Sequence, residues 1–119
     1  MLASQLEIKI HDILEYAGIT FEEEYTFDDL VTSNGRHLRF DFAIFDDDGN
    51  LDCLIEAQGK QHYVAVPKFG GSKGLYRQKY NDDLKKRYCL KNNIRLIAIP
   101  YFDENKINYD YIIRLINGY

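Results

Sequence analysis

Residues 38–58 read LRFDFAIFDDDGNLDCLIEAQ and contain two apolar segments, Leu38–Phe45 and Leu51–Gln58. Between them, Asp46–Asn50 consists of Asp, Gly and Asn, which favour tight turns. Two strand-like segments on either side of such a turn predict a β-hairpin. If the turn centres on Asp48 and Gly49, the numbers of any two paired residues sum to 97.

This register separates the side chains of the hairpin into two faces. One face is wholly apolar, and a slip by one residue would mix charged side chains into it, so the register is strongly favoured. On the other face, Asp41 lies opposite Glu56, with Cβ atoms about 4.5–5.5 Å apart. The apolar face holds Phe40, Phe42 and Ile44 with Ala57, Ile55 and Cys53, and the other holds Arg39, Asp41, Ala43 and Phe45 with Gln58, Glu56, Leu54 and Asp52.

Two carboxylates held this close repel each other, and opposed like charges destabilise a sheet. A divalent cation between Asp41 and Glu56 would relieve the repulsion, because carboxylate oxygens are ligands that Mg²⁺ accepts. The alternative is a salt-bridge cluster in which Arg39, diagonal to Glu56 and close to Asp41 in sequence, neutralises the pair. The residues alone favour the metal site and leave both possibilities open.

The remaining sequence predicts helices and strands around this hairpin. Ser4 with Glu7 three residues later has the spacing of a helix capping box, and Asn108 is placed to cap a last helix. The hydrophobic periodicity marks a first helix that ends near Gly18, a strand at Phe21–Phe27, an amphipathic helix from about Lys73 to Asn92 and a buried strand at Ile94–Ile99. The order α-β-β-β-α-β-α predicts an α/β fold, a mixed sheet flanked by helices with an extra C-terminal helix.

Length and composition fit one domain spanning residues 1–119, with 45% apolar and 29% charged residues. The net charge is −4, yet residues 60–95 hold ten Lys and Arg against Asp82 and Asp83 and carry +8, so the remainder carries −12. This asymmetry would let one basic face bind phosphates. A solvated, lysine-rich helix face would produce the same pattern.

Several classes of protein are disfavoured. No apolar run approaches the roughly 18 residues of a membrane span, so no membrane partner is expected. Cys53 and Cys89 are far apart and indicate reduced thiols in the cytoplasm. A single unpatterned pair of cysteines also argues against a zinc cluster.

Residues 39–42 (RFDF) and 55–63 (IEAQGKQHY) carry a family resemblance. The chain resembles the PD-(D/E)XK restriction-endonuclease-like nucleases, closest to the branch of very-short-patch-repair and EDxHD phage homing endonucleases. The likeness extends to the first helix, Phe69–Gly71, residues 81–89 (NDDLKKRYC) and Ile94–Tyr101. It implies an α-β-β-β-α-β core and hydrolysis of DNA phosphodiester bonds with Mg²⁺, for which Mn²⁺ would substitute.

The resemblance also assigns roles to individual residues. Asp41 would be the principal metal ligand, and Glu56 a second one, direct or through water. Gln58 stands where many relatives have lysine, and would orient the attacking water or the scissile phosphate. The histidine and the two flanking acids of the branch correspond to His62, Glu7 and Asp82.

The chain departs from the family pattern at two positions. Phe40 replaces the proline of the family name, a common change. Gln58 in place of lysine matters more, because a neutral amide can neither neutralise developing charge nor take a proton. Either His62 or the metal must then compensate, or the activity is weak.

Three of the assigned residues also have ordinary structural explanations. His62 could pack beside Tyr63 and bond to a backbone carbonyl, as many buried histidines do. Glu7 could serve only to cap its helix. Asp82 cannot be distinguished from its neighbour Asp83 by sequence alone.

Nucleic acid is the expected partner of the basic segment. Tyr76, Tyr80 and Tyr88 recur at helical spacing among these basic residues, which predicts core positions rather than base-stacking platforms. The candidate phosphate contacts are Lys60, Lys73, Arg77, Lys85, Lys86 and Arg87.

The function expected from sequence is that of a small metal-dependent DNA endonuclease or nickase, encoded by a phage or mobile element and acting in the host cytoplasm. Specificity would come from a homodimer, from a separate DNA-recognition partner or from DNA structure. The main alternative is a weakly active or inactive module on the same scaffold that binds nucleic acid or protein. A plain structural accessory protein would leave the opposed carboxylates unexplained.

Overall fold

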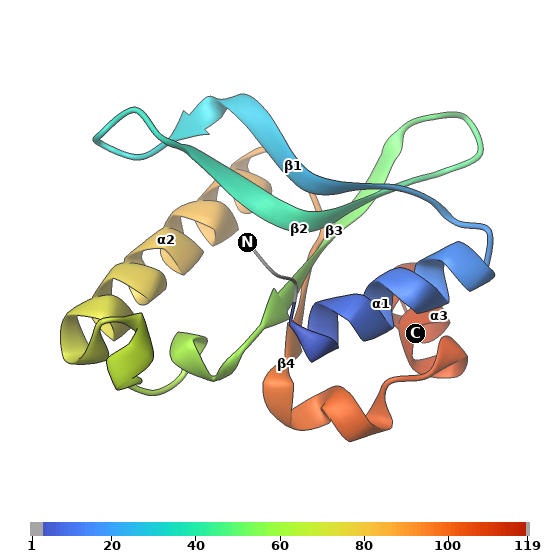
Figure 1. Ribbon diagram of the computed structural model, residues 1–119. Helices are drawn as coiled ribbons and strands as arrows, with labels where there is room; N and C mark the ends of the chain where they lie inside the picture. Colours follow the sequence, from blue (N-terminus) through green and yellow to red (C-terminus); the bar gives the residue numbers. More distant parts are fainter. Residues whose placement is uncertain (1–3, 119) are drawn as a thin grey trace.

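The computed structural model describes residues 4–118 and shows a four-stranded sheet with helices on both faces (Figure 1). In chain order the elements are α1 (Gln5–Tyr16), β1 (Thr20–Val31), β2 (His37–Phe45), β3 (Leu51–Gln58), the short 3₁₀ helices η1 (Lys60–His62) and η2 (Pro67–Phe69), α2 (Gly71–Lys91), β4 (Leu96–Pro100), the 3₁₀ helix η3 (Tyr101–Lys106) and α3 (Tyr109–Asn117).

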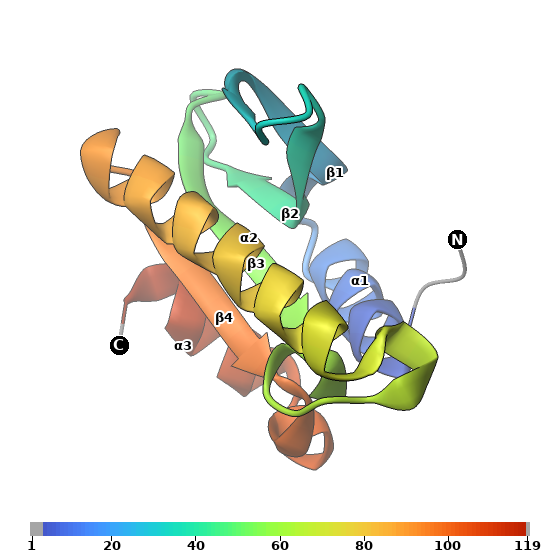
Figure 2. The ribbon, with the colours of Figure 1, turned by 90° about the vertical axis from the view of Figure 1, so that its left-hand side faces the viewer.

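The sheet has the strand order β1-β2-β3-β4. The pairs β1–β2 and β2–β3 are antiparallel, whereas β3 and β4 are parallel. The chain crosses from β3 to β4 through α2, which lies diagonally over the sheet (Figure 2). A mixed sheet with flanking helices and the additional helix α3 confirms the predicted α/β class.

The helices begin where their capping residues predict. The Ser4 hydroxyl accepts a hydrogen bond from the Glu7 backbone N–H at 3.1 Å, and the Asn108 side chain accepts one from Tyr111 at 2.9 Å. α1 and α3 bury their apolar faces in one core cluster on the same side of the sheet. No helix within residues 4–118 is long and apolar enough to cross a membrane.

The predicted register of the β2–β3 hairpin is confirmed. Phe42 pairs with Ile55, and Ile44 with Cys53. A bulge beside the turn then brings Phe45 opposite Leu51. Beyond Phe42 the structure records no further paired residues between these strands, so the predicted Asp41–Glu56 and Arg39–Gln58 couples are not part of the ladder.

The predicted apolar face is wrong at Phe40. Phe42 packs with α1 and α3, but Phe40 lies in the second core cluster, beneath α2. β1 changes sides at the matching point, because Phe21 packs against the first cluster and Tyr25 against the second. Between them Glu24 has a φ of 51°, so the alternation of side chains is interrupted there and at Asp41, the facing position of β2.

The prediction that Tyr76 and Tyr80 belong to the core is also wrong. Tyr76 is 79% exposed and Tyr80 52% exposed. The third tyrosine, Tyr88, is partly buried against the second cluster, and its hydroxyl donates to Asp29 at 2.6 Å. α2 turns a different face toward the carboxyl end of β3, and that face is polar.

Candidate functional site

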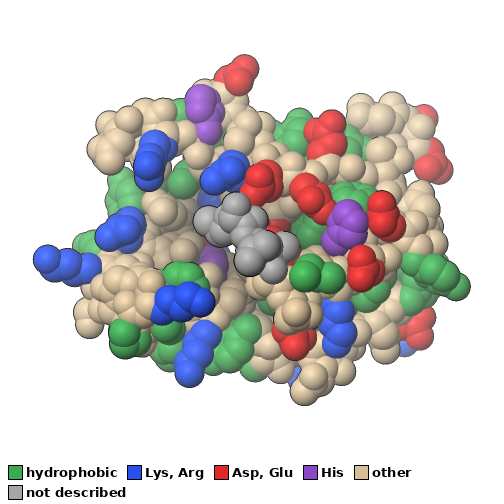
Figure 3. All heavy atoms as spheres, in the orientation of Figure 1, with side chains coloured by type: hydrophobic (Ala, Val, Ile, Leu, Met, Phe, Trp, Pro, Cys, Tyr) green, Lys and Arg blue, Asp and Glu red, His purple; other side chains and the backbone are tan. Residues whose placement is uncertain are grey.

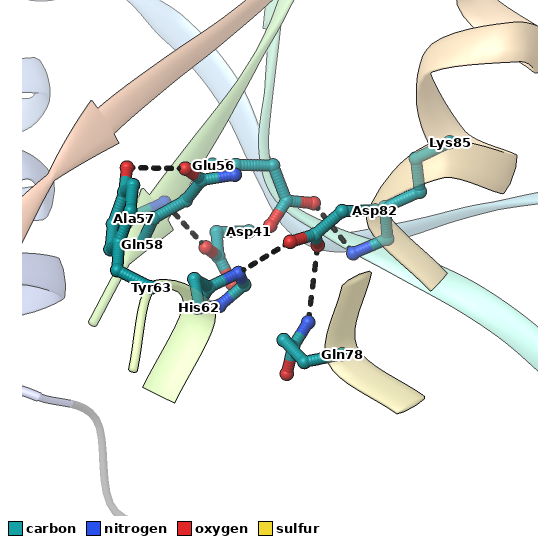
Figure 4. Close-up of polar contacts among 9 residues, drawn as sticks. All are labelled: Asp41, Glu56, Ala57, Gln58, His62, Tyr63, Gln78, Asp82 and Lys85. Carbon is teal, nitrogen blue, oxygen red and sulfur yellow. Dashed lines mark hydrogen bonds and ion pairs between the residues drawn. The ribbon is translucent and has the colours of Figure 1, made fainter. Parts of the chain in front are cut away.

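Polar side chains from four elements meet at the carboxyl end of β3, on the side covered by α2 (Figure 4). Asp41 comes from β2, Glu56 from β3, His62 from η1, and Asp82 and Lys85 from α2. Four of these five were predicted as catalytic residues and Lys85 as a nucleic-acid contact, and Figure 4 shows all five pointing toward one another. The elements converge there because α2 crosses the sheet directly over β3.

Asp41 takes the place of a backbone partner at the interrupted point of β2. Its Oδ2 accepts a hydrogen bond from the Ala57 backbone N–H at 2.7 Å. Burial raises the pKa of Asp41 above its ordinary value, although this hydrogen bond and the nearby charges of Lys85 and His62 oppose the rise. The side chain is thereby fixed beside Glu56 on the neighbouring strand.

Glu56 is the most deeply buried acid of the cluster, with 5% of its surface exposed. Its Oε1 accepts a hydrogen bond from Lys85 Nζ at 2.8 Å. Burial, helped by the charge of Asp41, raises the pKa of Glu56 to about 8, although Lys85 opposes the rise. The lysine therefore offsets only part of what it costs to bury this carboxylate next to another one.

Lys85, predicted as a phosphate contact, is buried in the cluster rather than exposed on α2. Only 8% of the residue is exposed, and Nζ lies 5.2 Å from the centre of the Phe40 ring. The inward spacing of Gln78, Asp82, Lys85 and Cys89 along α2 was the sequence signal that could have revealed it. Lys85 thereby places a cation beside the carboxylate of Glu56.

The salt-bridge alternative required Arg39 to neutralise Asp41 and Glu56, and Arg39 does not do so. It is exposed, and its Nη1 lies 3.5 Å from Oε2 of Glu24. An ion pair does exist in the cluster, but its cation comes from α2 rather than from β2. Part of the salt-bridge alternative therefore survives with a different partner.

His62 and Asp82 form the second half of the cluster. His62 Nδ1 lies 3.0 Å from Asp82 Oδ2, and Gln78 donates to Asp82 Oδ1 at 3.1 Å. Burial by itself would raise the pKa of Asp82, but the hydrogen bond and charge of His62, with Gln78 and Lys85, hold it below its ordinary value. Asp83 instead points outward and pairs with Arg87 at 2.9 Å.

Gln58 and Glu7 lie at the margin of the cluster. Gln58 Oε1 accepts a hydrogen bond from the Tyr63 hydroxyl at 2.7 Å. Glu7 is the capping-box residue of α1, and burial together with the charge of Asp41 raises its pKa. Glu7 therefore both caps α1 and lies near the site.

The other candidate phosphate contacts remain on the surface. Lys60, Lys73, Arg77, Lys86 and Arg87 are all exposed. On the face seen in Figure 3, most Lys and Arg side chains gather over the half that contains α2, and most Asp and Glu over the half that contains β1 and α1. The charge asymmetry of the sequence is thus also an asymmetry in space.

A resident metal would rely on few protein ligands. Within residues 4–118 no group of three or more His, Cys, Asp and Glu side chains is arranged to hold an ion. Asp41 and Glu56 supply two adjacent carboxylates. Burial raises the pKa of both, and at Glu56 the charge of Asp41 adds to the rise. Hard oxygen donors of this kind fit Mg²⁺, which normally retains several waters and needs only one or two carboxylates.

Comparison with known proteins relates the chain to viral proteins. "Uncharacterized protein 307L" of Invertebrate iridescent virus 6 is 40% identical over 72 residues, which cover 60% of this chain and 36% of that protein. "Uncharacterized protein 094L" of Frog virus 3 (isolate Goorha) is 43% identical over 54 residues, 44% of this chain and 35% of that protein. "Uncharacterized protein 033L" of Invertebrate iridescent virus 3 is 42% identical over 59 residues, 43% of this chain and 30% of that protein.

These matches cover about a third of each viral relative, from 30% to 36% of its length. No family model matches the chain. No solved structure matches it either.

Proposed function

We propose that the chain is a metal-dependent nuclease with a restriction-endonuclease-like fold, hydrolysing DNA phosphodiester bonds as an endonuclease or nickase. The observation that carries the proposal is the convergence of Asp41, Glu56, His62 and Asp82 with a buried lysine at one end of β3. The α-β-β-β-α-β order and the mixed sheet also support it. Ordinary structural roles for these residues one by one do not account for their convergence at one place.

In this proposal Asp41 and Glu56 would hold Mg²⁺ or Mn²⁺. The chemistry such an ion supplies when bound is a lowered pKa of its water and withdrawal of charge from a phosphoryl oxygen. The charge of Lys85 lies beside the same carboxylates, and a cation there stabilises the negative charge that develops during phosphoryl transfer. Lys85 thereby supplies the charge that Gln58 lacks.

His62 is the proposed proton-transfer group. If its Nδ1 carries the proton shared with Asp82, Nε2 is the ring nitrogen that accepts a proton from water or delivers one to the leaving oxygen. Asp82 would hold the ring in this tautomer, and Gln78 would hold Asp82. Because the Tyr63 hydroxyl occupies Gln58 Oε1, the amide N–H₂ of Gln58 is the end that would face water or phosphate.

The DNA-binding surface and the place of action are proposed from the charge distribution and from the viral relatives. DNA would bind across the exposed cations of α2, with specificity from a homodimer, a separate recognition partner or DNA structure. Similarity to viral proteins supports a viral gene, and the cytoplasm of a host cell is the proposed place of action. The proposed nuclease domain comprises residues 1–119.

The Lys85–Glu56 ion pair also favours a second candidate function. This pair reduces the repulsion between the carboxylates without any metal. A chain that had lost catalysis, as Gln58 in place of lysine would allow, could keep the scaffold as a module that binds nucleic acid or protein. Such a module would retain DNA in a salt-sensitive way without cleaving it.

A plasmid-nicking assay with Mg²⁺ or Mn²⁺ separates the two functions. The nuclease should convert supercoiled plasmid to nicked or linear DNA, and chelator or Asp41→Asn should abolish the conversion. The matched control is Asp83→Asn, an exposed aspartate on α2 whose loss should leave nicking unchanged. If the wild type and Asp41→Asn nick equally, the nicking comes from a contaminant and the nuclease proposal fails.

A further inference from the structure

α2 leaves part of the sheet uncovered beside the candidate site. The helix lies over β2 and β3, while the edge strand β4 runs alongside it (Figure 2). Between α2 and β4 lies a groove of about 430 Å³. Leu96 and Ala98 lie in β4 on one side of it, and Cys89 and Leu90 in α2 on the other. The groove thus presents apolar surface to solvent.

One end of this groove belongs to the candidate site. Glu56, Gln58, Asp82 and Lys85 line it together with the apolar residues. In the parallel pairing of β3 with β4, Glu56 is the direct neighbour of Ala98. Since paired strands lie about 4.8 Å apart, a molecule resting on Ala98 would lie against the candidate catalytic carboxylate.

We propose that this groove binds the base of an unpaired nucleotide, so that the preferred substrate is a nucleic acid with a bulged or single-stranded nucleotide next to the cleaved bond. The inference rests on the proposed nuclease function and names its substrate class. The groove volume falls within the range of small-molecule sites, about 300–1,000 Å³. A base paired within a duplex cannot enter, because its faces are stacked and its edge is occupied.

Chemical complementarity favours a nucleotide as the occupant. A base offers flat faces to the apolar walls, and its polar edge would meet the side chain of Gln58 at the end of the groove. Lys86, which also lines the groove, is exposed and is available to the phosphate of the same nucleotide. Leu90, 79% exposed on the rim, would be covered by the bound base.

The test compares two fluorescent DNA hairpins by anisotropy, one fully paired and one with a single bulged nucleotide, in buffer with chelator so that no cleavage occurs. The wild type should bind the bulged hairpin at least about fivefold tighter. Ala98→Trp, which fills the groove, should reduce this preference to below about twofold. Leu90→Ser removes an exposed wall without disturbing the core, and should reduce it by about threefold.

The matched control is Ser33→Trp, which adds the same side chain at an exposed position in the β1–β2 turn and should keep the full preference. Equal affinity of the wild type for both hairpins, or full preference in both groove variants, would overturn the inference. So would sedimentation showing a wild-type dimer that Ala98→Trp converts to a monomer, because the groove would then hold a second copy. Since no metal is present, absence of nicking would defeat the nuclease proposal without deciding this one.

Discussion

Replacing Lys85 by methionine would test whether the buried ion pair shapes the site. Methionine matches the apolar stem of lysine but leaves Glu56 without the cation 2.8 Å away. Both residues are nearly inaccessible, with 5% of Glu56 and 8% of Lys85 exposed. Removing one partner of a buried pair costs about 3–5 kcal/mol, because the other charge remains uncompensated.

This cost should depend on pH in a definite direction. A carboxyl whose pKa is raised in the folded state destabilises the fold once ionised, so stability falls as the pH rises from the unfolded pKa of 4.5 through the folded pKa of about 8. Without Lys85 the folded pKa rises further. Near pH 6 the free energy of unfolding of the variant should fall by only about 1–2 kcal/mol, mainly from the lost hydrogen bond. Near pH 9 it should fall by the whole cost of the unpaired charge, about 3–5 kcal/mol.

Urea denaturation at the two pH values measures both losses. Lys86→Met, at the exposed neighbouring position, is the control and should change stability by less than about 0.5 kcal/mol. Adding Glu56→Gln to Lys85→Met should restore most of the stability lost near pH 9. A loss of the same size at both pH values, or no restoration by Glu56→Gln, would refute the reasoning.

Three other outcomes are expected. Asp82→Asn should cost about 1–3 kcal/mol near pH 7 in urea denaturation, whereas Asp83→Asn should cost almost nothing. Because the pKa of Asp82 is lowered in the folded state, the stability difference between wild type and Asp82→Asn should disappear as the pH falls below 3.8. A difference that persists there would contradict this reasoning. Phe40→Ala should cost about 3–5 kcal/mol in thermal unfolding, and Tyr76→Ala less than about 0.5 kcal/mol; similar losses would refute the burial assigned to them. Mg²⁺ at a hundred times its dissociation constant should stabilise the wild type by about 2.7 kcal/mol in thermal unfolding but not Asp41→Asn; equal shifts in both would place the ion elsewhere.

The hairpin could be predicted because its information is local. The turn composition and the alternation of apolar residues fix the pairing of Phe42 with Ile55 within one short stretch. The side on which Phe40 packs could not be predicted in this way. It depends on the interruption at Glu24, a residue of the neighbouring strand whose backbone conformation the hairpin sequence does not encode.

The candidate site could be predicted for the residues that carry a pattern, and not for Lys85. Asp41 and Glu56 follow from the strand register, and His62 and Asp82 from the resemblance. The position of Lys85 depends on which face of α2 docks, and the spacing of the tyrosines suggested a different face. In this helix, burial of polar groups against the site outweighs burial of Tyr76 and Tyr80, because those groups have partners on β3 and η1.

The separation of these residues along the chain has a consequence for how the molecule folds. Asp41 reaches Ala57 across 16 positions within one hairpin, whereas Glu56 meets Lys85 across 29 positions and only after the crossover helix has docked. Short loops close before long ones. The two acids are therefore brought together before their cation arrives, and we expect refolding to be fastest in mildly acidic solution, where a proton can serve in its place.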